Sequence, residues 1–167
     1  MDLTPYVRWI VFLHVLGAFA FAAGHGVSMV VAFKLRRETD RGRMAALLDV
    51  SATSLNLAGI GLLVLLVAGI LAGIVLGSFG RAWIWIALVL FIVVGGAMTP
   101  FGAIYFNKIR LAIGMRPRNL KPEDPDPVPA SDAELAVLLA TRRPEALLLI
   151  GAGGFLVILY FMYFRPF

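Results

Sequence analysis

The sequence predicts an all-α fold, a single four-helix bundle (residues 1–167) that is an integral membrane protein. Hydrophobic residues make up 60% of the chain and charged residues only 15%, so the bilayer is the expected solvent for most of it. Most of the apolar residues fall in long runs that do not alternate with polar residues, which argues against membrane β-strands. Each run can cross about 30 Å of hydrocarbon at about 1.5 Å per helical residue. We therefore predict spans at residues 9–33, 55–77, 82–106 and 146–164.

The distribution of positive charge predicts the orientation of the four spans, because Lys and Arg near span ends tend to stay in the cytoplasm. The loop after the first span and the loop after the third hold twelve of the 15 Lys and Arg residues, and only Arg8, Arg81 and Arg165 lie on the other side. Both termini are therefore predicted to lie outside the cytoplasm (N-out/C-out). The start "MDLTPYVRW" lacks the basic region of a secretory signal, so we expect the first span to be retained.

The segments between the spans carry their own signals. The spacing of Met44, Leu47 and Leu48 in the first loop predicts that the second helix begins in the cytoplasm. The link "SFGRA" is so short that the second and third helices should be antiparallel neighbours. Residues 114–131 form a Pro-rich cytoplasmic loop with mixed charges. Ser131 and Glu134 then form a capping box, which starts either a short interfacial helix or the cytoplasmic part of the fourth helix.

Several function classes are disfavoured by what the chain lacks. It has no cysteine, which excludes disulfides, Fe–S clusters, covalently attached haem and thiolate metal sites. No span has an acidic residue in its middle, so the usual parts of a carboxylate-based proton pump are missing. No nucleophile elbow, phosphate loop or zinc-protease signature is present, and no enzyme class is predicted. The net charge of +5 reflects membrane topology, so nucleic acid is not an expected partner.

Both histidines of the chain lie in the first span, in the stretch "LHVLGAFAFAAGHG". At about 100° per residue, His14 and His25 share one helix face and lie about 16 Å apart along the axis. An ionisable residue inside a membrane is costly, and histidine is a common axial ligand of haem iron, so both are candidate ligands of haem iron or another metal. Small residues on this face, Gly17 above all, would let a porphyrin approach. The same features also fit a neutral histidine hydrogen bonded inside a tightly packed bundle.

Methionines could complete a metal site. Met98 follows Ala82 by the same number of residues as His25 follows Trp9, so His25 and Met98 should lie at a similar depth. His and Met are a known axial pair of haem iron. By depth, Met162 is the methionine nearest His14. Met29 follows His25 by one helical turn, and this pair could hold a soft ion such as Cu(I). Without a methionine ligand, a haem site could instead take one histidine from each subunit of a two-fold dimer, or could hold a five-coordinate iron with a single protein ligand.

Glycine spacing predicts close helix packing. Gly69, Gly73 and Gly77 recur every four residues in the second span, and such a stripe lets another helix approach closely. We favour a partner helix within the chain over one from a second subunit.

The chain resembles a family of bacterial four-helix integral membrane proteins of unassigned activity, in its "FLHVLGAFAFAAG" segment, its basic first loop and its end "LYFMYFRPF". It is more distantly similar to CopD-type copper-resistance membrane domains and to short four-helix protoporphyrinogen oxidases, which share a histidine early in the first helix. The resemblance implies a haem-binding role for His14. His25 has no counterpart, and the tryptophan often found after the histidine is absent.

Together these observations predict a b-type haem protein of the bacterial plasma membrane, for electron transfer or a redox reaction, with haem bound at least through His14. If both histidines bind haem, the two irons would form an electron path across the membrane. A cofactor-free accessory or assembly subunit of a larger membrane complex is the main rival hypothesis. Copper handling through His25 and Met29 is the third. The expected partners are the lipid bilayer and either a second copy of the chain or other membrane subunits.

Overall fold

A computed structural model describes residues 2–116, 121 and 123–166, and all of its regular structure in this part is helical. Four helices are long and apolar enough to cross a membrane, as predicted. The elements are, in chain order, η1 (Thr4–Tyr6), α1 (Val7–Leu35), α2 (Arg41–Val75), η2 (Ser78–Gly80), α3 (Ala82–Ala112), α4 (Asp132–Leu139), α5 (Arg143–Leu148), the π-helical segment η3 (Leu149–Gly153) and α6 (Gly154–Phe164).

The helices extend beyond the predicted apolar spans, mostly at one end of the bundle. Helix α2 begins at Arg41, where the Asp40 side chain accepts a hydrogen bond from the Arg43 backbone, so the predicted extension into the first loop is confirmed. The capping box is also confirmed, because Ser131 and Glu134 bond reciprocally at the start of α4. Helix α4 ends at Leu139 and is separate from α5, which fits a short helix of its own better than a straight extension of the fourth span.

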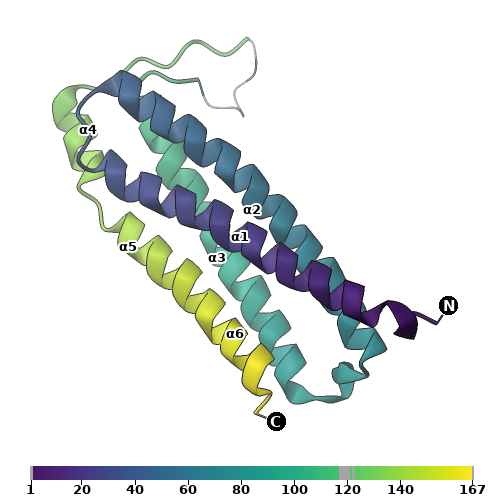
Figure 1. Ribbon diagram of the computed structural model, residues 1–167. Coiled ribbons are helices and arrows are strands. Elements are labelled where there is room, and N and C mark those ends of the chain that lie inside the picture. The colour runs from purple at the N-terminus through teal and green to yellow at the C-terminus, as the bar shows by residue number, and fades with distance from the viewer. Residues whose placement is uncertain (1, 117–120, 122, 167) are drawn as a thin grey trace.

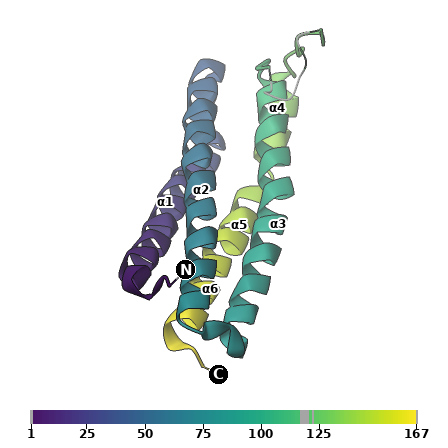
Figure 2. The same cartoon turned by 90° about the vertical axis from the view of Figure 1, so that its right-hand side faces the viewer.

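The four long segments form two helix pairs. Helix α1 packs along α2 in the most extensive contact of the molecule, and α3 packs mainly against α6. Figure 1 shows α1 running along α2, and Figure 2 shows α3 and α4 set apart from this pair. We call the boundary between these two pairs the seam. Although α2 and α3 are joined by a short turn, they contact each other sparsely.

Three glycines bring α1 and α2 together backbone to backbone. A Cβ added to Gly17 would lie 2.6 Å from the Leu65 nitrogen, and one added to Gly24 would lie 2.4 Å from the Ser54 oxygen. On the facing helix, a Cβ on Gly61 would lie 2.5 Å from the Phe21 nitrogen. No side chain fits at these positions, so the close packing depends on these glycines more than on the predicted stripe. In that stripe, Gly73 meets side chains of α3 and η2.

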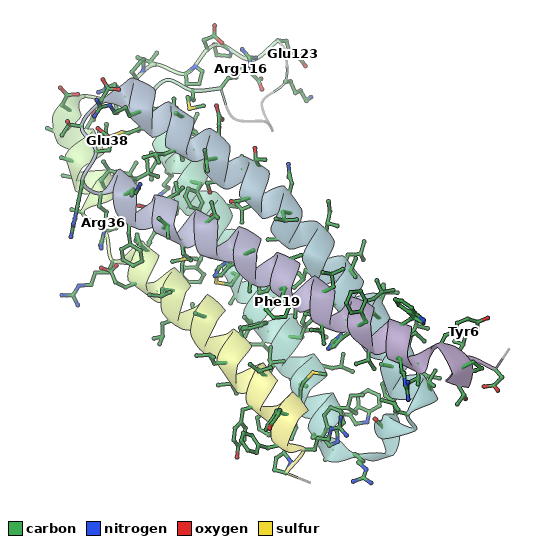
Figure 3. The ribbon with its side chains drawn as sticks, viewed as in Figure 1. Tyr6, Phe19, Arg36, Glu38, Arg116 and Glu123 are labelled. Atoms are coloured by element: carbon green, nitrogen blue, oxygen red, sulfur yellow. The ribbon has the colours of Figure 1, made fainter. Side chains whose placement is uncertain are left out.

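Charged side chains gather at the end of the bundle that carries the α1–α2 connection and the loop after α3, here called the loop end. Figure 3 shows Arg36, Glu38, Arg116 and Glu123 there, while Tyr6 lies at the opposite end with both chain termini. The flanks between the two ends expose many large apolar side chains, such as Phe19 at 71% and Ile92 at 68%. This surface suits contact with a lipid bilayer.

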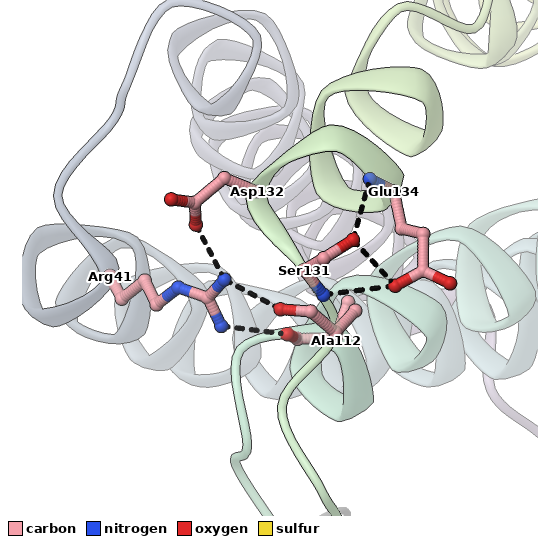
Figure 4. A network of polar contacts seen from close by, with 6 residues as sticks. Arg41, Ala112, Ser131, Asp132 and Glu134 are labelled. Carbon is pink, nitrogen blue, oxygen red and sulfur yellow. Dashed lines mark hydrogen bonds and ion pairs between the residues drawn. The ribbon is translucent and has the colours of Figure 1, made fainter.

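Three arginines tie the two pairs together at the loop end. Arg41 of α2 donates to the carbonyl oxygens of Ala112 (3.2 Å) and Ala130 (2.6 Å) and to the Asp132 carboxylate (2.7 Å), as Figure 4 shows in part. Arg110 of α3 donates to the Leu48 carbonyl at 2.6 Å. Arg36, just after α1, binds the Glu145 carboxylate and the Thr141 carbonyl. Beneath these contacts lies a hydrophobic core that includes Leu35, Met44, Leu48, Tyr105, Ile109 and Leu147.

Candidate functional site

Both histidines lie on the seam, at two levels. His14 contacts α2 and lines a cavity whose other walls come from α2, η2, α3 and α6. His25 contacts the η3 segment and lines a second cavity nearer the loop end. The seam therefore brings together the residues that the sequence proposes as ligands, and each histidine has its own surroundings.

The ring of His14 is held by helix α2. Its Nδ1 lies 2.8 Å from the Leu65 carbonyl oxygen. A carbonyl can only accept a hydrogen bond, so Nδ1 must carry the proton, and in the neutral ring Nε2 keeps its lone pair. Gly69 gives the ring its space, because a Cβ there would lie 2.8 Å from both Cε1 and Nδ1. The imidazole is thus fixed in orientation and tautomer, with one basic nitrogen left over.

The cavity beside His14 is small and apolar. Its volume is about 60 Å³, and its walls include Phe79, Ile84, Phe91, Ile158 and Met162. Met162 was the methionine nearest His14 by depth, and the two residues line the same cavity. Ligand pockets commonly measure about 300 to 1,000 Å³. The closed seam therefore has room here for a few small molecules or an ion but not for a macrocycle.

Two polar groups lie near the chain termini, at the end of the bundle opposite the loop end. Within the described residues, the buried indole nitrogen of Trp83 has no hydrogen-bond partner, and its neighbour Ile84 lines the cavity. Arg165, at the end of α6, places its guanidinium 5.5 Å from the Trp83 ring centroid. The Arg165 guanidinium therefore faces the Trp83 ring, and neither residue is among those that line the cavity.

His25 lacks the anchor that His14 has. Its ring stacks on Phe21, with centroids 5.6 Å apart and the planes 7° from parallel. Its Nε2 is buried and has no hydrogen-bond partner in the described part of the chain. A buried polar atom without a partner is costly. The adjoining cavity measures about 330 Å³ and is lined by residues that include Met29, Phe33, Gly151 and Phe155.

Gly151 is the point where His25 and Met98 meet. A Cβ added to Gly151 would lie 2.4 Å from His25 Nε2 and 3.2 Å from the Met98 methyl carbon. Gly151 belongs to η3, and π-helical turns inside α-helices occur frequently at functional sites. The residues predicted to share a depth, His25 and Met98, therefore lie against one glycine of the fourth span.

Gly17 does not face either cavity. It packs against the α2 backbone. The prediction that a porphyrin approaches α1 at Gly17 is therefore not supported, because helix α2 occupies this position. Sequence reasoning did not single out Leu65, whose carbonyl binds His14, or Gly151, which contacts His25. A backbone carbonyl has no sequence signal, and Gly151 was one glycine of the run "GAGG".

No group of three His, Cys, Asp or Glu side chains that could hold a metal occurs among the described residues. A site on the seam would therefore use imidazole and thioether ligands. Comparison of the chain with protein-family models, curated proteins and solved structures finds no significant match. The described residues form a helical protein with four helices that are long and apolar enough to cross a membrane.

Proposed function

We propose that the protein is a b-type haem protein of the bacterial plasma membrane, which serves electron transfer or redox chemistry and uses His14 as an axial ligand. The observation that supports this most is the hydrogen bond between His14 Nδ1 and the Leu65 carbonyl oxygen. Histidines that bind a metal commonly donate their other ring N–H to such a partner, which orients the ring and raises its basicity. Haem supplies the one-electron chemistry when bound, and the protein sets its position and surroundings.

Two side chains that haem iron accepts as ligands lie beside the first cavity. His14 and Met162 line the same cavity, and His with Met is a known axial pair. The cavity of about 60 Å³ would have to widen by movement of α3 and α6 away from the α1–α2 pair. Such a movement would separate side chains across the seam, whereas the glycine contacts between α1 and α2 lie outside it.

A haem between His25 and Met98 would have to displace backbone as well as side chains. A porphyrin surrounds its iron on four sides, and the Gly151 backbone lies directly against both side chains. The ring would collide with η3 in this arrangement. We therefore place the haem at His14 alone and do not retain the two-haem path across the membrane.

The orientation belongs to the same proposal, with the loop end in the cytoplasm and both termini outside. Its support is the concentration of Lys and Arg at the loop end. Because the chain has no cysteine, a single cysteine at Ser78 or at Asp124 can be labelled with an impermeant thiol reagent in intact cells. Labelling at Ser78→Cys and not at Asp124→Cys is expected, and the reverse pattern would contradict the orientation.

The test of the haem is a reduced-minus-oxidised absorption spectrum of the protein purified in detergent from haem-replete cells. We expect a b-type spectrum that His14→Ala abolishes and His25→Ala retains. Gly69→Ala should also reduce haem content, because its Cβ would lie against the His14 ring, whereas Gly59→Ala on the same helix has nothing within 4 Å and is the matched control. A colourless wild-type protein would contradict the proposal and favour the accessory-subunit hypothesis.

A further inference from the structure

The second cavity, which lies between α1 and the fourth span, is open to the flank of the bundle and is here called the flank cavity. It measures about 330 Å³, within the range of ligand pockets. Val30 of α1 and Leu148 of α5 line it and are 56% and 43% exposed. No charged side chain lines it, and the buried Nε2 of His25 lies against Gly151. The space therefore suits an apolar occupant that arrives from the lipid side.

The flank cavity follows α1 over more than three helical turns. Phe21 and Phe33 are the first and last residues of α1 that line it, and they lie about 18 Å apart at about 1.5 Å per residue. One leaflet of a bilayer contributes about 15 Å of hydrocarbon. Between them, the Cβ position of Gly26 has no atom within 4 Å among the described residues. The cavity is thus long enough for an acyl chain of one leaflet, and no side chain fills the space in front of Gly26.

Positive charge lies at the loop end of the flank cavity. Lys34 follows the lining residue Val30 by one turn of α1, and Arg37 comes four residues after the lining residue Phe33. Both side chains are exposed, and neither has a hydrogen bond or an ion pair in the part of the chain that the structure describes. The nearby Glu38 carboxylate accepts hydrogen bonds from two backbone N–H groups. Lys34 and Arg37 are therefore available to an anion from outside the chain.

An ion pair joins the two walls of the flank cavity at the same end. Arg36, three residues after Phe33, binds the carboxylate of Glu145, which lies three residues before Leu148. Figure 3 shows Arg36 at the loop end together with Glu38. The apolar cavity therefore ends at a polar boundary, where the negative charge of Glu145 is already paired.

These features together favour one class of ligand. A gap that no atoms fill loses dispersion contacts, and an acyl chain from the surrounding lipid restores them. Cations at a membrane surface attract anionic headgroups. A neutral lipid would meet the first requirement and would gain nothing from the second. An anionic phospholipid meets both.

We propose that the flank cavity binds one acyl chain of an anionic phospholipid, whose phosphate lies at Lys34 and Arg37. The lipid would occupy the flank of the seam at the level of His25. This binding does not depend on the haem at His14, because the two histidines line different cavities.

The experiment is native mass spectrometry of the full chain released from detergent, after addition of phosphatidylglycerol and phosphatidylethanolamine with the same acyl chains. We expect one retained phosphatidylglycerol per chain, preferred over phosphatidylethanolamine by about tenfold or more, because two cations attract its headgroup. Phosphatidylglycerol should also raise the thermal unfolding temperature of the wild type, since a ligand of the folded state stabilises it.

Two variants test the two halves of the site. Lys34→Gln combined with Arg37→Gln should bind both lipids equally. Its matched control is Arg43→Gln combined with Lys108→Gln, which removes the same charge from exposed residues of α2 and α3 that do not line the cavity. That control should keep the preference for phosphatidylglycerol.

Gly26→Leu tests the cavity itself. The new side chain has room and should fill the space that the acyl chain needs, so the retained lipid and its effect on the unfolding temperature should both be lost. Gly59→Leu on α2 is the matched control, because its Cβ position is also open and it does not line the cavity.

Three results would overturn the proposal. The first is equal retention of the two lipids by the wild type, and the second is an equal loss of preference in both charge variants, which would indicate a general effect of net charge. The third is displacement of phosphatidylglycerol by a neutral quinone, which would make the cavity a quinone site. The charge variants keep the test decisive if Gly26→Leu does not fold.

Discussion

The interface between α1 and α2 and the seam between the two helix pairs are built from different contacts. In the first, Gly17, Gly24 and Gly61 bring one backbone onto the other, and none of these glycines lines either of the two cavities beside the histidines. At the seam, side chains from both pairs line two cavities. The hydrogen bonds that connect the two pairs are concentrated at the loop end. Membrane helices gain little from apolar contact as such, because lipid is equally apolar, and close packing decides which pairs are strong. The seam is therefore the boundary at which a bound group can be accommodated.

The largest effect should follow from a side chain placed inside the α1–α2 interface. We expect Gly24→Ala to destabilise the protein by about 3 kcal/mol or more, since its Cβ would lie 2.4 Å from the Ser54 carbonyl oxygen and backbone cannot yield as a side chain does. The thermal unfolding temperature in detergent measures the change.

Gly59→Ala is the matched control, because a Cβ on Gly59 has no atom within 4 Å, and it should unfold at the wild-type temperature or above it. Similar unfolding temperatures for the two variants would show that the glycine contacts between α1 and α2 do not govern stability.

An intermediate effect is expected where the seam is tied at the loop end. Arg41→Leu removes hydrogen bonds to the Ala112 and Ala130 carbonyls and to Asp132. Hydrogen bonds from charged groups contribute about 1.5 to 3 kcal/mol each at most, and partial exposure of Arg41 lowers this, so we expect a loss of about 2 kcal/mol.

Hydrogen exchange distinguishes this loosening from general unfolding. In Arg41→Leu, faster exchange is expected in α4 and at the end of α3, with α1 and the middle of α2 unchanged. Arg43→Leu is the control, since no side-chain hydrogen bond or ion pair of Arg43 occurs among the described residues. Equally faster exchange along α1 would contradict the division into two pairs.

The smallest effect concerns a polar contact inside the α1–α2 interface. Ser28 Oγ lies 2.7 Å from Ser51 Oγ, and both side chains are buried. Hydrogen bonds between membrane helices average about 0.6 kcal/mol in double-mutant cycles. A cycle built from Ser28→Ala, Ser51→Ala and the double variant should give a coupling energy of about that size. A coupling near zero would mean that glycine packing alone determines this interface.

The residues of the seam show how far sequence reasoning reaches. Counting residues from the span ends predicted a similar depth for His25 and Met98, and both lie against Gly151. It also linked His14 with Met162, and they line one cavity. Depth is readable because a helix rises by a constant amount per residue. The direction in which a residue faces around the bundle cannot be counted in this way. For this reason the sequence predicted Gly17 on a face open to a cofactor, whereas Gly17 packs against α2.

The glycine stripe teaches the same lesson. The spacing of Gly69, Gly73 and Gly77 predicted close helix packing, yet in the structure Gly69 accommodates the His14 ring, Gly73 meets side chains and Gly77 adopts a positive φ of 61° in the turn before η2. The backbone contacts use Gly17, Gly24 and Gly61 instead. Regular spacing of glycines identifies a helix face made of small residues. It does not say which neighbouring helix or side chain packs against that face.

By itself, the sequence determined the helical class, the approximate extent of the four spans, the early start of α2 and the capping box at Ser131. All of these depend on hydropathy, helical period and local hydrogen bonding within a few residues. Only the tertiary structure decided that α1 pairs with α2, that the Leu65 carbonyl fixes the His14 tautomer, and that a π-helical turn places Gly151 against His25. Those features depend on how helices far apart in the chain rotate and pack against one another, which no local pattern encodes.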